Sequence, residues 1–576
     1  MKITRTYTII SLILLLFLFS KQIYSQNLKF PQNYFRSPVD FNITLAGNFA
    51  ELRNNHFHSG IDIRTFTTGK KVYAIADGFI SRIKISSGGY GRAIYIDHPN
   101  GYTSVFAHLD HFNTAIEEFV KAHQYKNKSF EFDLTLKKNQ IEIKKGSIIA
   151  FSGNTGSSAG PHLHFEIRDT QSEHPLNPLF FGFKIKDTTP PKIFNFYAYP
   201  LDSISNVNGF NSRQSFPVTY YNNAYHLKGD PKMKFLGNIG FALETNDYMD
   251  NTWGKCGIFD LKMKINDSLI SSYSFKEFSF DESRYINSHM DYELNTTKNK
   301  RIHKTYKEPN NKLSIYSKMK NNGIYHFKKK INYKIDFLVS DANSNKSKLR
   351  VYAKGNQIEK VFPREDYEMR MNCGKENIFK AEDLEVKFPK NSFYSTIPFT
   401  YSVEQDSNYL SKIHLIHNEY IPVHKFYTIS IKPNHIPSGK SDKLFITRIN
   451  NKGKTSYEGG IYFDSSVKTK TRSFGKFAVS IDTIPPTIKP RTNFKLKSLH
   501  GQKSIRFSIT DELSGIKSYE GLIDGKWVLF EYDAKNDHLF YVFDNRRLIS
   551  KKKHQLQVKV RDQLGNQKIF KTDFVW

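Results

Sequence analysis

The sequence predicts a mainly β protein, with an antiparallel-sheet domain followed by β-sandwich domains. Most segments read as short strands of alternating apolar and polar residues, separated by Gly, Asn, Asp and Pro. The run "AIYIDHPNGYTSVFAHL" is an example, because Pro99-Asn100-Gly101 supplies turn residues between two strand patterns. Helical periodicity is confined to a short candidate around residues 113–123. At 576 residues the chain needs several domains, since single cores rarely exceed roughly 250–300 residues.

The first residues predict an export signal. Lys2 and Arg5 precede an apolar run from Ile9 to Phe19, and small or polar residues follow it. The run is too short to span a bilayer comfortably and matches a secretory signal cleaved near Ser25, with an uncleaved anchor as the alternative. No cysteine follows it, which argues against lipoprotein processing, and no later apolar segment is long enough to cross a membrane. We expect an exported mature chain with no transmembrane segment.

Charge and cysteine content narrow the classes of partner and site. The net charge is +30, from 85 basic and 55 acidic residues. Because export is expected, this charge favours anionic envelope polymers over nucleic acid as a partner, although genome composition with a merely solvated charge explains it equally well. Cys256 and Cys373 cannot form a disulfide framework or a zinc-thiolate cluster. They fall in different predicted domains, so we expect no bridge between them.

One phrase recurs along the chain. "DTTPP" begins at Asp187 and "DTIPP" at Asp482, and each precedes strand-like runs, Asp-rich turns and a closing turn near Asp341 or Asp562. A diproline suits a domain entrance because it cannot donate to a sheet ladder. The two copies indicate two modules of one type, which resemble bacterial immunoglobulin-like sandwiches, the first with larger insertions. Calcium is an alternative role for the Asp-rich turns, but we expect turn formation.

The predicted organisation has five segments. They are a signal peptide (1–25), a first domain (26–186), an immunoglobulin-like sandwich with insertions (187–355), a β-rich domain of uncertain type (356–481) and a second immunoglobulin-like sandwich (482–576).

The residues that carry chemistry lie in the first domain. In "HFHSGID", a strand reading places His58, Gly60 and Asp62 on one face and Ile61 and Ile63 on the other. His56 also lies on the polar face, so spacing alone cannot choose between the two histidines.

A second motif is "GPHLHFEIR". Strand alternation places His162, His164 and Glu166 on one face, while the apolar residues between them face the core. Imidazole nitrogen and carboxylate oxygen are common zinc ligands, and a catalytic site leaves a fourth position for water. For Glu166 we expect a solvated strand carboxylate, with orientation of a ligand imidazole as the alternative.

Two weaker signals accompany these motifs. His108 lies in the strand-like "VFAHLD", and the Gly-Ser loop "SGNTGSSAGPH" leads directly into the His-x-His strand. A later group of histidines has no carboxylate at ligand spacing, so we expect it to have packing or surface roles. Its members are His414, His417, His424 and His435.

In this order, the motifs resemble the lysostaphin-type (LytM-type) zinc endopeptidases of bacterial cell walls. The resemblance covers about residues 45–170, including "KVYAIADGFI" and "KKGSIIAFSGNTGSSAGPHLHFEI". It implies a zinc site of His58, Asp62 and His164, with His108 and His162 as catalytic histidines whose individual roles stay open. It makes His56 a residue at the groove edge or behind the ligands.

Two departures from the family pattern stand out. Phe106 occupies a position where the family usually has Tyr. The segment from about residue 111 to 145 is longer than in minimal members. It could form part of a substrate wall or a regulatory lid, and the sequence does not decide between these two roles. Neither departure removes a ligand.

The resemblance implies a periplasmic, zinc-dependent endopeptidase that cuts peptide cross-links of peptidoglycan and is positioned by its β-sandwich domains. It leaves an envelope protein partner open. The first alternative is a non-catalytic LytM-like envelope protein that binds peptidoglycan or activates an amidase. The second is a zinc peptidase acting on proteins.

Overall fold

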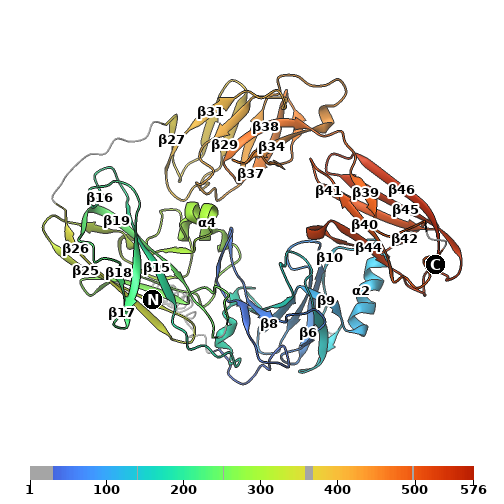
Figure 1. The fold of residues 1–576 in the computed structure, drawn as a ribbon, viewed down its shortest axis with the longest axis horizontal. Coiled ribbons are helices and arrows are strands. Elements are labelled where there is room, and N and C mark those ends of the chain that lie inside the picture. The colour runs from blue at the N-terminus through green and yellow to red at the C-terminus, as the bar shows by residue number, and fades with distance from the viewer. Residues whose placement is uncertain (1–29, 139, 251, 357–366, 496–497) are drawn as a thin grey trace, which may run out of the picture.

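The structure, a computed structural model, describes residues 30–138, 140–250, 252–356, 367–495 and 498–576. Four β-rich parts follow one another around a ring, and the last returns to the first (Figure 1). The mainly β fold class is therefore confirmed. The predicted signal peptide lies outside the described residues. No helix of the described ranges has the length and apolar character needed to cross a membrane.

The first part is built on a nine-stranded antiparallel sheet in the order β1-β4-β13-β8-β7-β6-β10, with β11 paired to β6 and β14 to β13. Its strands are β1 (Leu45–Gly47), β4 (Ile61–Arg64), β6 (Gly78–Ile85), β7 (Arg92–Asp97), β8 (Tyr102–Ala107), β10 (Phe132–Thr135), β11 (Glu142–Ile143), β13 (His162–Asp169) and β14 (Pro175–Leu176). The smaller elements are β2 (Leu52–Arg53), β3 (His56–Phe57), β5 (Lys71–Tyr73), β9 (Leu109–Phe112), β12 (Ile148–Ser152), α2 (Thr114–Asn127) and η1 (Pro178–Phe180).

Sheet register brings the distant motifs of this part together. His164 on β13 lies opposite Asp62 of β4 on one side and Ala107 of β8 on the other. Leu163 and Phe165 are fully buried in the core, which confirms the predicted alternation. The sheet therefore holds three polar motifs on one face because the apolar residues between them fill the other.

The predicted hairpin and helix of this part are also present. β7 and β8 pair antiparallel around Gly101, whose φ of 84° requires the left-handed region. The helix begins at Thr114, where the Asn113 side chain accepts a hydrogen bond from the Ile116 amide at 2.9 Å. It ends at Asn127, before the left-handed Lys128.

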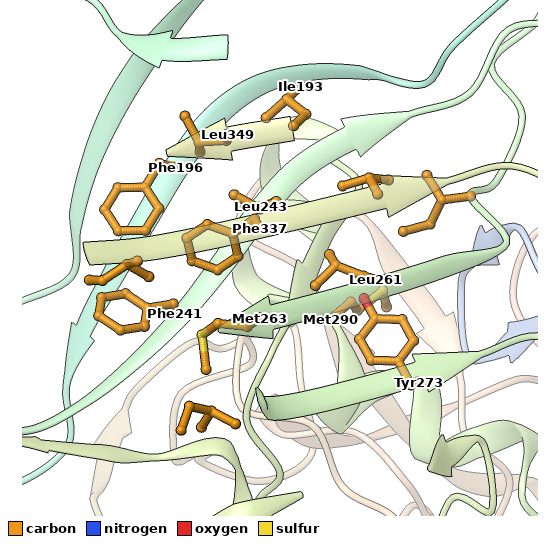
Figure 2. Packing of buried hydrophobic residues seen from close by; sticks show 14 of the residues in the cluster. Ile193, Phe196, Phe241, Leu243, Leu261, Met263, Tyr273, Met290, Phe337 and Leu349 are labelled. Atoms are coloured by element: carbon orange, nitrogen blue, oxygen red, sulfur yellow. The ribbon is translucent and has the colours of Figure 1, made fainter. Parts of the chain in front are cut away.

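The second part forms a twelve-stranded sheet around the core of Figure 2, which includes Phe196, Phe241 and Phe337. Its strands are β15 (Lys192–Pro200), β16 (Asn206–Val207), β17 (Gln214–Tyr221), β18 (Ala224–Leu227), β19 (Met233–Asn246), β20 (Asp260–Ile265), β21 (Ser268–Ser274), β22 (Ile302–Lys304), β23 (Tyr316–Met319), β24 (Tyr325–Phe327), β25 (Asn332–Ser340) and β26 (Lys346–Gly355). Its helices are η2 (Ser283–Tyr285), α3 (Ile286–His289), α4 (Tyr292–Lys298) and η3 (Lys320–Gly323).

The first two parts are packed together. Phe49, Leu52 and Phe57, from and beside the β2–β3 hairpin, belong to the core of the second part. The Phe57 amide also donates to the Ser283 hydroxyl at 2.9 Å. The hairpin that precedes His58 is therefore held by the second part.

The third part has two five-stranded sheets and a two-stranded pair around one apolar core. Its elements are β27 (Met369–Met371), β28 (Asn377–Lys380), β29 (Leu384–Phe388), β30 (Ile397–Phe399), β31 (Tyr401–Glu404), β32 (Ile413–Ile416), β33 (Tyr427–Ile431), η4 (Ser441–Lys443), β34 (Leu444–Ile449), β35 (Thr455–Tyr457), β36 (Ile461–Phe463), β37 (Ser466–Thr471) and β38 (Gly475–Ile481). Cys256 and Cys373 are both free, as expected.

The fourth part has two four-stranded sheets that share one core. Its elements are β39 (Thr487–Pro490), β40 (Ser504–Thr510), β41 (Ile516–Ile523), β42 (Lys526–Val528), β43 (Phe530–Asp533), η5 (Ala534–Asn536), β44 (His538–Val542), β45 (Lys553–Asp562) and β46 (Gln567–Val575).

The repeated phrase has the same local geometry in both copies. In the second part, the Asn345 amide donates to the Asp187 carbonyl at 3.1 Å and to the Asp341 carboxylate at 2.7 Å. In the fourth part, Asn566 makes the corresponding bonds at 3.0 and 2.8 Å, to Asp482 and Asp562. Each closing turn is thus tied to the start of its own module.

Candidate metal centre and active site

His58, Asp62 and His164 converge on one point. His58 Nε2 lies 3.1 Å from Asp62 Oδ1, and His164 Nδ1 lies 2.9 Å from the same oxygen. The two imidazole nitrogens are 3.0 Å apart, and all three side chains are buried.

Close strand packing makes this convergence possible. A Cβ added to Gly60 would lie 2.3 Å from the Phe165 carbonyl oxygen. Any side chain at Gly60 would therefore push the HSGID segment away from β13 and separate His58 from His164.

Hydrogen bonds on the far sides of the rings determine which nitrogens face the centre. His58 Nδ1–H donates to the Asn48 carbonyl at 2.7 Å, and His164 Nε2–H donates to Glu166 at 2.8 Å. A neutral imidazole has one N–H, so each ring directs a lone pair toward Asp62 Oδ1. Ligand atoms of a tetrahedral zinc ion with bonds of about 2.0–2.1 Å lie roughly 3.3 Å apart. The three residues therefore fit a zinc ion with an open fourth position.

Arg53 orients the carboxylate of this centre. Its Nη2 donates to Asp62 Oδ2 at 2.6 Å and lies 3.4 Å from the buried Glu51. Oδ2 is therefore engaged, and Oδ1 is left to face the imidazoles. Arg53 and Asn48 both support the centre, but no motif spacing in the sequence identifies either of them.

The expectation of a solvated Glu166 is wrong. The side chain is fully buried, and besides His164 it accepts hydrogen bonds from Arg168 at 2.7 Å, from Ser59 at 2.5 Å and from the Tyr90 hydroxyl. The Arg168 charge offsets the cost of burying the carboxylate. Glu166 therefore orients His164, which was the alternative.

His108 and His162 lie beside the three converging residues. The ring centroids of His108 and His162 are 4.8 Å apart, and His162 Nε2 lies 3.4 Å from Asp62 Oδ1. His108 Nδ1–H donates to the Thr155 carbonyl and His162 Nδ1–H to the Gly160 carbonyl, each at 2.9 Å. Both acceptors belong to the Gly-Ser loop (residues 153–161), and both rings keep Nε2 free to accept a proton.

The backbone at His108 is unusual for its residue type. Its φ is 59°, in the left-handed region, at the junction of β8 and β9. Its amide donates to the Tyr90 carbonyl at 2.9 Å. Such strain is concentrated at functional sites, where the surrounding structure enforces it.

The charges of the centre favour a cation. Burial lowers the pKa of His164, but Asp62 and Glu166 outweigh this effect and raise the pKa to about 9. Burial, followed by the neighbouring His164 and His162, lowers the pKa of His108 to about 3. Without a metal, this pKa lets a proton occupy His164 between the carboxylates. In the neutral ring that binds a metal, the same place is open to a cation, while His108 stays neutral.

The remaining predicted residues lie outside this cluster. His56 is exposed, and its Nδ1–H donates to the Asn54 carbonyl at 2.9 Å. Phe106 is buried against Phe165 on the core face, so the departure from Tyr does not touch the centre.

The later histidines have other partners. His414 contacts the Tyr401 hydroxyl at 2.9 Å, and His417 Nδ1 accepts from the Thr400 amide at 3.3 Å. His424 stacks on Tyr285 with centroids 4.1 Å apart. None of them belongs to a group of metal-ligand side chains found among the described residues.

The Asp-rich turns of the two modules also gather carboxylates. In each module, oxygens of three aspartates lie within 4.8 Å of one another. The groups are Asp187, Asp247 and Asp341, and Asp482, Asp511 and Asp562. Asp511 accepts from the Gly515 amide at 2.7 Å, and Asp341 accepts from the Asn345 backbone amide at 2.8 Å, which are hydrogen bonds of turn-forming aspartates. Turn formation in place of calcium binding stays a prediction.

Comparisons with known proteins agree with the first part. Residues 56–125 and 130–178 match the model of peptidase family M23, and residues 368–482 match that of a Zu5-like domain. The predicted LytM-type resemblance is thus confirmed for the first part. The β-rich part of uncertain type is similar to a Zu5-like domain and is called the Zu5-like part below.

Three relatives illustrate the range of the match. The chain is 36% identical over 132 residues to the DD-carboxypeptidase/endopeptidase Mpg of Neisseria meningitidis, covering 23% of this chain and 24% of that protein. It is 33% identical over 123 residues to the murein hydrolase activator NlpD of Escherichia coli, covering 21% and 26%. A solved zinc containing peptidase from Vibrio cholerae is 26% identical, with a TM-score of 0.19, covering 25% and 39%. The chain spans about a quarter of the length of these curated relatives.

Proposed function

We propose that the peptidase family M23 domain of this chain is a zinc-dependent endopeptidase that hydrolyses peptide cross-links of peptidoglycan. The observation that carries the proposal is the convergence of three lone-pair donors beside two imidazoles with free Nε2 atoms. Mpg and NlpD, whose names refer to an endopeptidase and to murein hydrolysis, support this substrate class. We place the mature protein in the periplasm, where the positive charge of the chain, +30 with the predicted signal peptide included, suits an anionic polymer.

The residues divide into a metal-holding set and a proton-handling set. His58, Asp62 and His164 would hold zinc, which supplies a Lewis acid for the scissile carbonyl and a water of lowered pKa. His108 and His162 each carry their proton on Nδ1, so that Nε2 of either ring can take a proton from the attacking water. Once protonated, the same atom can donate to a developing oxyanion or to the leaving amine.

Digestion of defined cross-linked muropeptides, with mass spectrometry of the products, tests the proposal. We expect zinc-dependent release of cleaved peptides by the wild type and no release by Asp62→Ala, because that variant lacks the shared carboxylate ligand. Full activity of Asp62→Ala, or cleavage that is indifferent to zinc removal, would contradict the proposal.

The similarity to NlpD favours a second candidate, a non-catalytic envelope protein that activates another hydrolase. Metal analysis separates the two candidates. An enzyme of the proposed kind should bind zinc with one-to-one stoichiometry through the three converging residues. A purified protein that holds no zinc and takes none up would support the activator. The presence of all five predicted residues, four histidines and one aspartate, favours the enzyme.

A further inference from the structure

The fourth part of the chain closes the ring by docking on the peptidase domain beside α2 (Figure 1). Arg92, which is buried, binds Glu117 of α2 at 3.2 Å and Glu531 of β43 at 2.8 Å. Leu529 belongs to the apolar core of the peptidase domain, and Trp527 packs edge-on against Tyr125. The long segment 111–145 therefore provides the docking face for the last module.

One side chain of this module reaches beyond α2 to the Gly-Ser loop. Lys535 lies in η5, the turn between β43 and β44. Its ammonium donates to the Ser158 carbonyl at 2.9 Å and to the Asn154 carbonyl. Because an ammonium has three donors and a carbonyl only accepts, one cation ties together two points four residues apart in the loop.

The same stretch of loop orients both predicted catalytic histidines. Thr155, whose carbonyl accepts from His108, lies between the two carbonyls that Lys535 holds. The Ser158 hydroxyl donates to the Gly160 carbonyl at 2.8 Å and lies 3.2 Å from His162 Nδ1. A shift of Asn154 or Ser158 would therefore move the acceptors that keep the proton on Nδ1 of each ring.

The loop is also held against the neighbouring turn, because the Thr155 hydroxyl accepts from the Arg92 amide at 3.0 Å and donates to the Leu109 carbonyl at 2.9 Å. The Ser157 amide donates to the Gly89 carbonyl at 2.9 Å, and the His162 amide donates to the Gly153 carbonyl at 3.3 Å. Gly156 has a φ of 68°, and a Cβ added there would lie 2.4 Å from the Gly91 amide nitrogen, so the tip packs closely on that turn. Lys535 adds the contacts to Asn154 and Ser158, which flank this packed tip.

We infer that Lys535 is a positioning residue for the peptidase centre, and that the last module completes the active site by holding the Gly-Ser loop under His108 and His162. The inference rests on the proposed function for its catalytic consequence. It explains why a residue more than 370 positions after the loop points into it. The module is thus part of the catalytic architecture in addition to any role in localisation.

The test compares full-length Lys535→Met and Lys535→Arg variants with Lys526→Met, which alters an exposed lysine of the same module. For Lys535→Met we expect kcat on a cross-linked muropeptide to fall by about 10- to 100-fold, with KM and zinc content nearly unchanged. Amide hydrogen exchange should accelerate at residues 153–161, while the melting temperature stays close to that of the wild type. Lys535→Arg, which keeps a cationic donor, should recover most of both losses, and Lys526→Met should match the wild type.

Unchanged exchange at residues 153–161 in Lys535→Met would overturn the inference. An equal fall in kcat for Lys526→Met would also overturn it, because the effect would then belong to the module's charge and not to this contact. If the wild type cleaves no muropeptide, the proposed function fails instead, and the exchange experiment still decides whether Lys535 holds the loop.

Discussion

Two groups of buried histidines, one in the peptidase domain and one in the Zu5-like part, show what distinguishes a candidate metal site from core packing. Burial is the largest effect on the pKa of His108 and of His414, lowering them to about 3 and about 4. The same residue type is thus neutral in both places, and low exposure does not tell them apart.

The difference lies in the partners. In the peptidase domain a carbonyl or carboxylate accepts from the outer nitrogen of each ring. In the neutral rings that bind a metal, the inner nitrogens of His58 and His164 therefore face Asp62 as lone pairs. In the Zu5-like part, His417 Nδ1 instead accepts from the Thr400 backbone amide and lies 3.1 Å from the Thr400 hydroxyl, and no carboxylate among the described residues is paired with it. Oriented lone pairs and a shared anion, more than buried imidazoles, therefore mark the metal centre.

The largest expected effect that tests the contrast between the two groups of histidines is a loss of cleavage activity in His108→Ala and His162→Ala. Each should lower the rate of muropeptide cleavage by about 10²- to 10⁴-fold while zinc content is retained, because these rings handle protons and do not hold the metal. His417→Ala, which alters a buried histidine of the other group, should leave the cleavage rate near the wild-type value. Loss of zinc in His108→Ala or His162→Ala would show that the two sets of residues are not separate.

A smaller effect is expected for Glu166→Gln. The amide keeps the shape but binds His164 and Arg168 less strongly, so zinc affinity should fall by about 10- to 100-fold. Competition with a chelator of known affinity measures this change. Glu404→Gln, at a half-exposed carboxylate paired with Lys476 at 2.6 Å, is the matched control and should leave zinc affinity unchanged. If the zinc affinity of Glu166→Gln equals that of the wild type, Glu166 has a purely structural role.

Lowering the pH should alter the stability of the Zu5-like part measurably through its buried histidines. These histidines should have the smallest effect on activity. Burial lowers the pKa values of His414, His417 and His424 to about 4, below the usual value of 6.5. At these three positions the unfolded chain binds more protons than the folded one as pH falls from 6.5 to 4. Their contribution to the free energy of unfolding therefore drops across this window and is constant above it. Full protonation of one such histidine costs roughly 3 kcal/mol.

Chemical unfolding at pH values between 4 and 8 measures this drop in the free energy of unfolding, with hydrogen exchange in the Zu5-like part as the readout. His417→Asn keeps an acceptor for the Thr400 amide and should flatten the slope. A slope that is the same in the variant would assign the pH dependence to other groups.

Much of the fold near the centre could be predicted from local patterns. The β7–β8 hairpin, the strand faces of β13 and the start of α2 at its Asn113 cap all follow from residues within a few positions of one another. The end of α2 was less predictable, because Lys128 stops the helix in a left-handed conformation without a glycine. The packing of Phe49 and Phe57 into the second part was not predictable, since it depends on residues more than 200 positions away.

The sequence by itself determined which side chains can face one another in pairs, because alternation along an extended strand is a property of the local backbone. It placed His58 with Asp62 and His162 with His164 on common faces. Only the tertiary structure decided the burial of Glu166, the protonated nitrogen of each ring and the contact of Lys535 with the Gly-Ser loop. Ser59, Tyr90 and Lys535 come from segments distant in sequence from the groups they contact. The acceptors of the ring N–H groups are nearer in sequence, but only the fold places them within hydrogen-bonding distance.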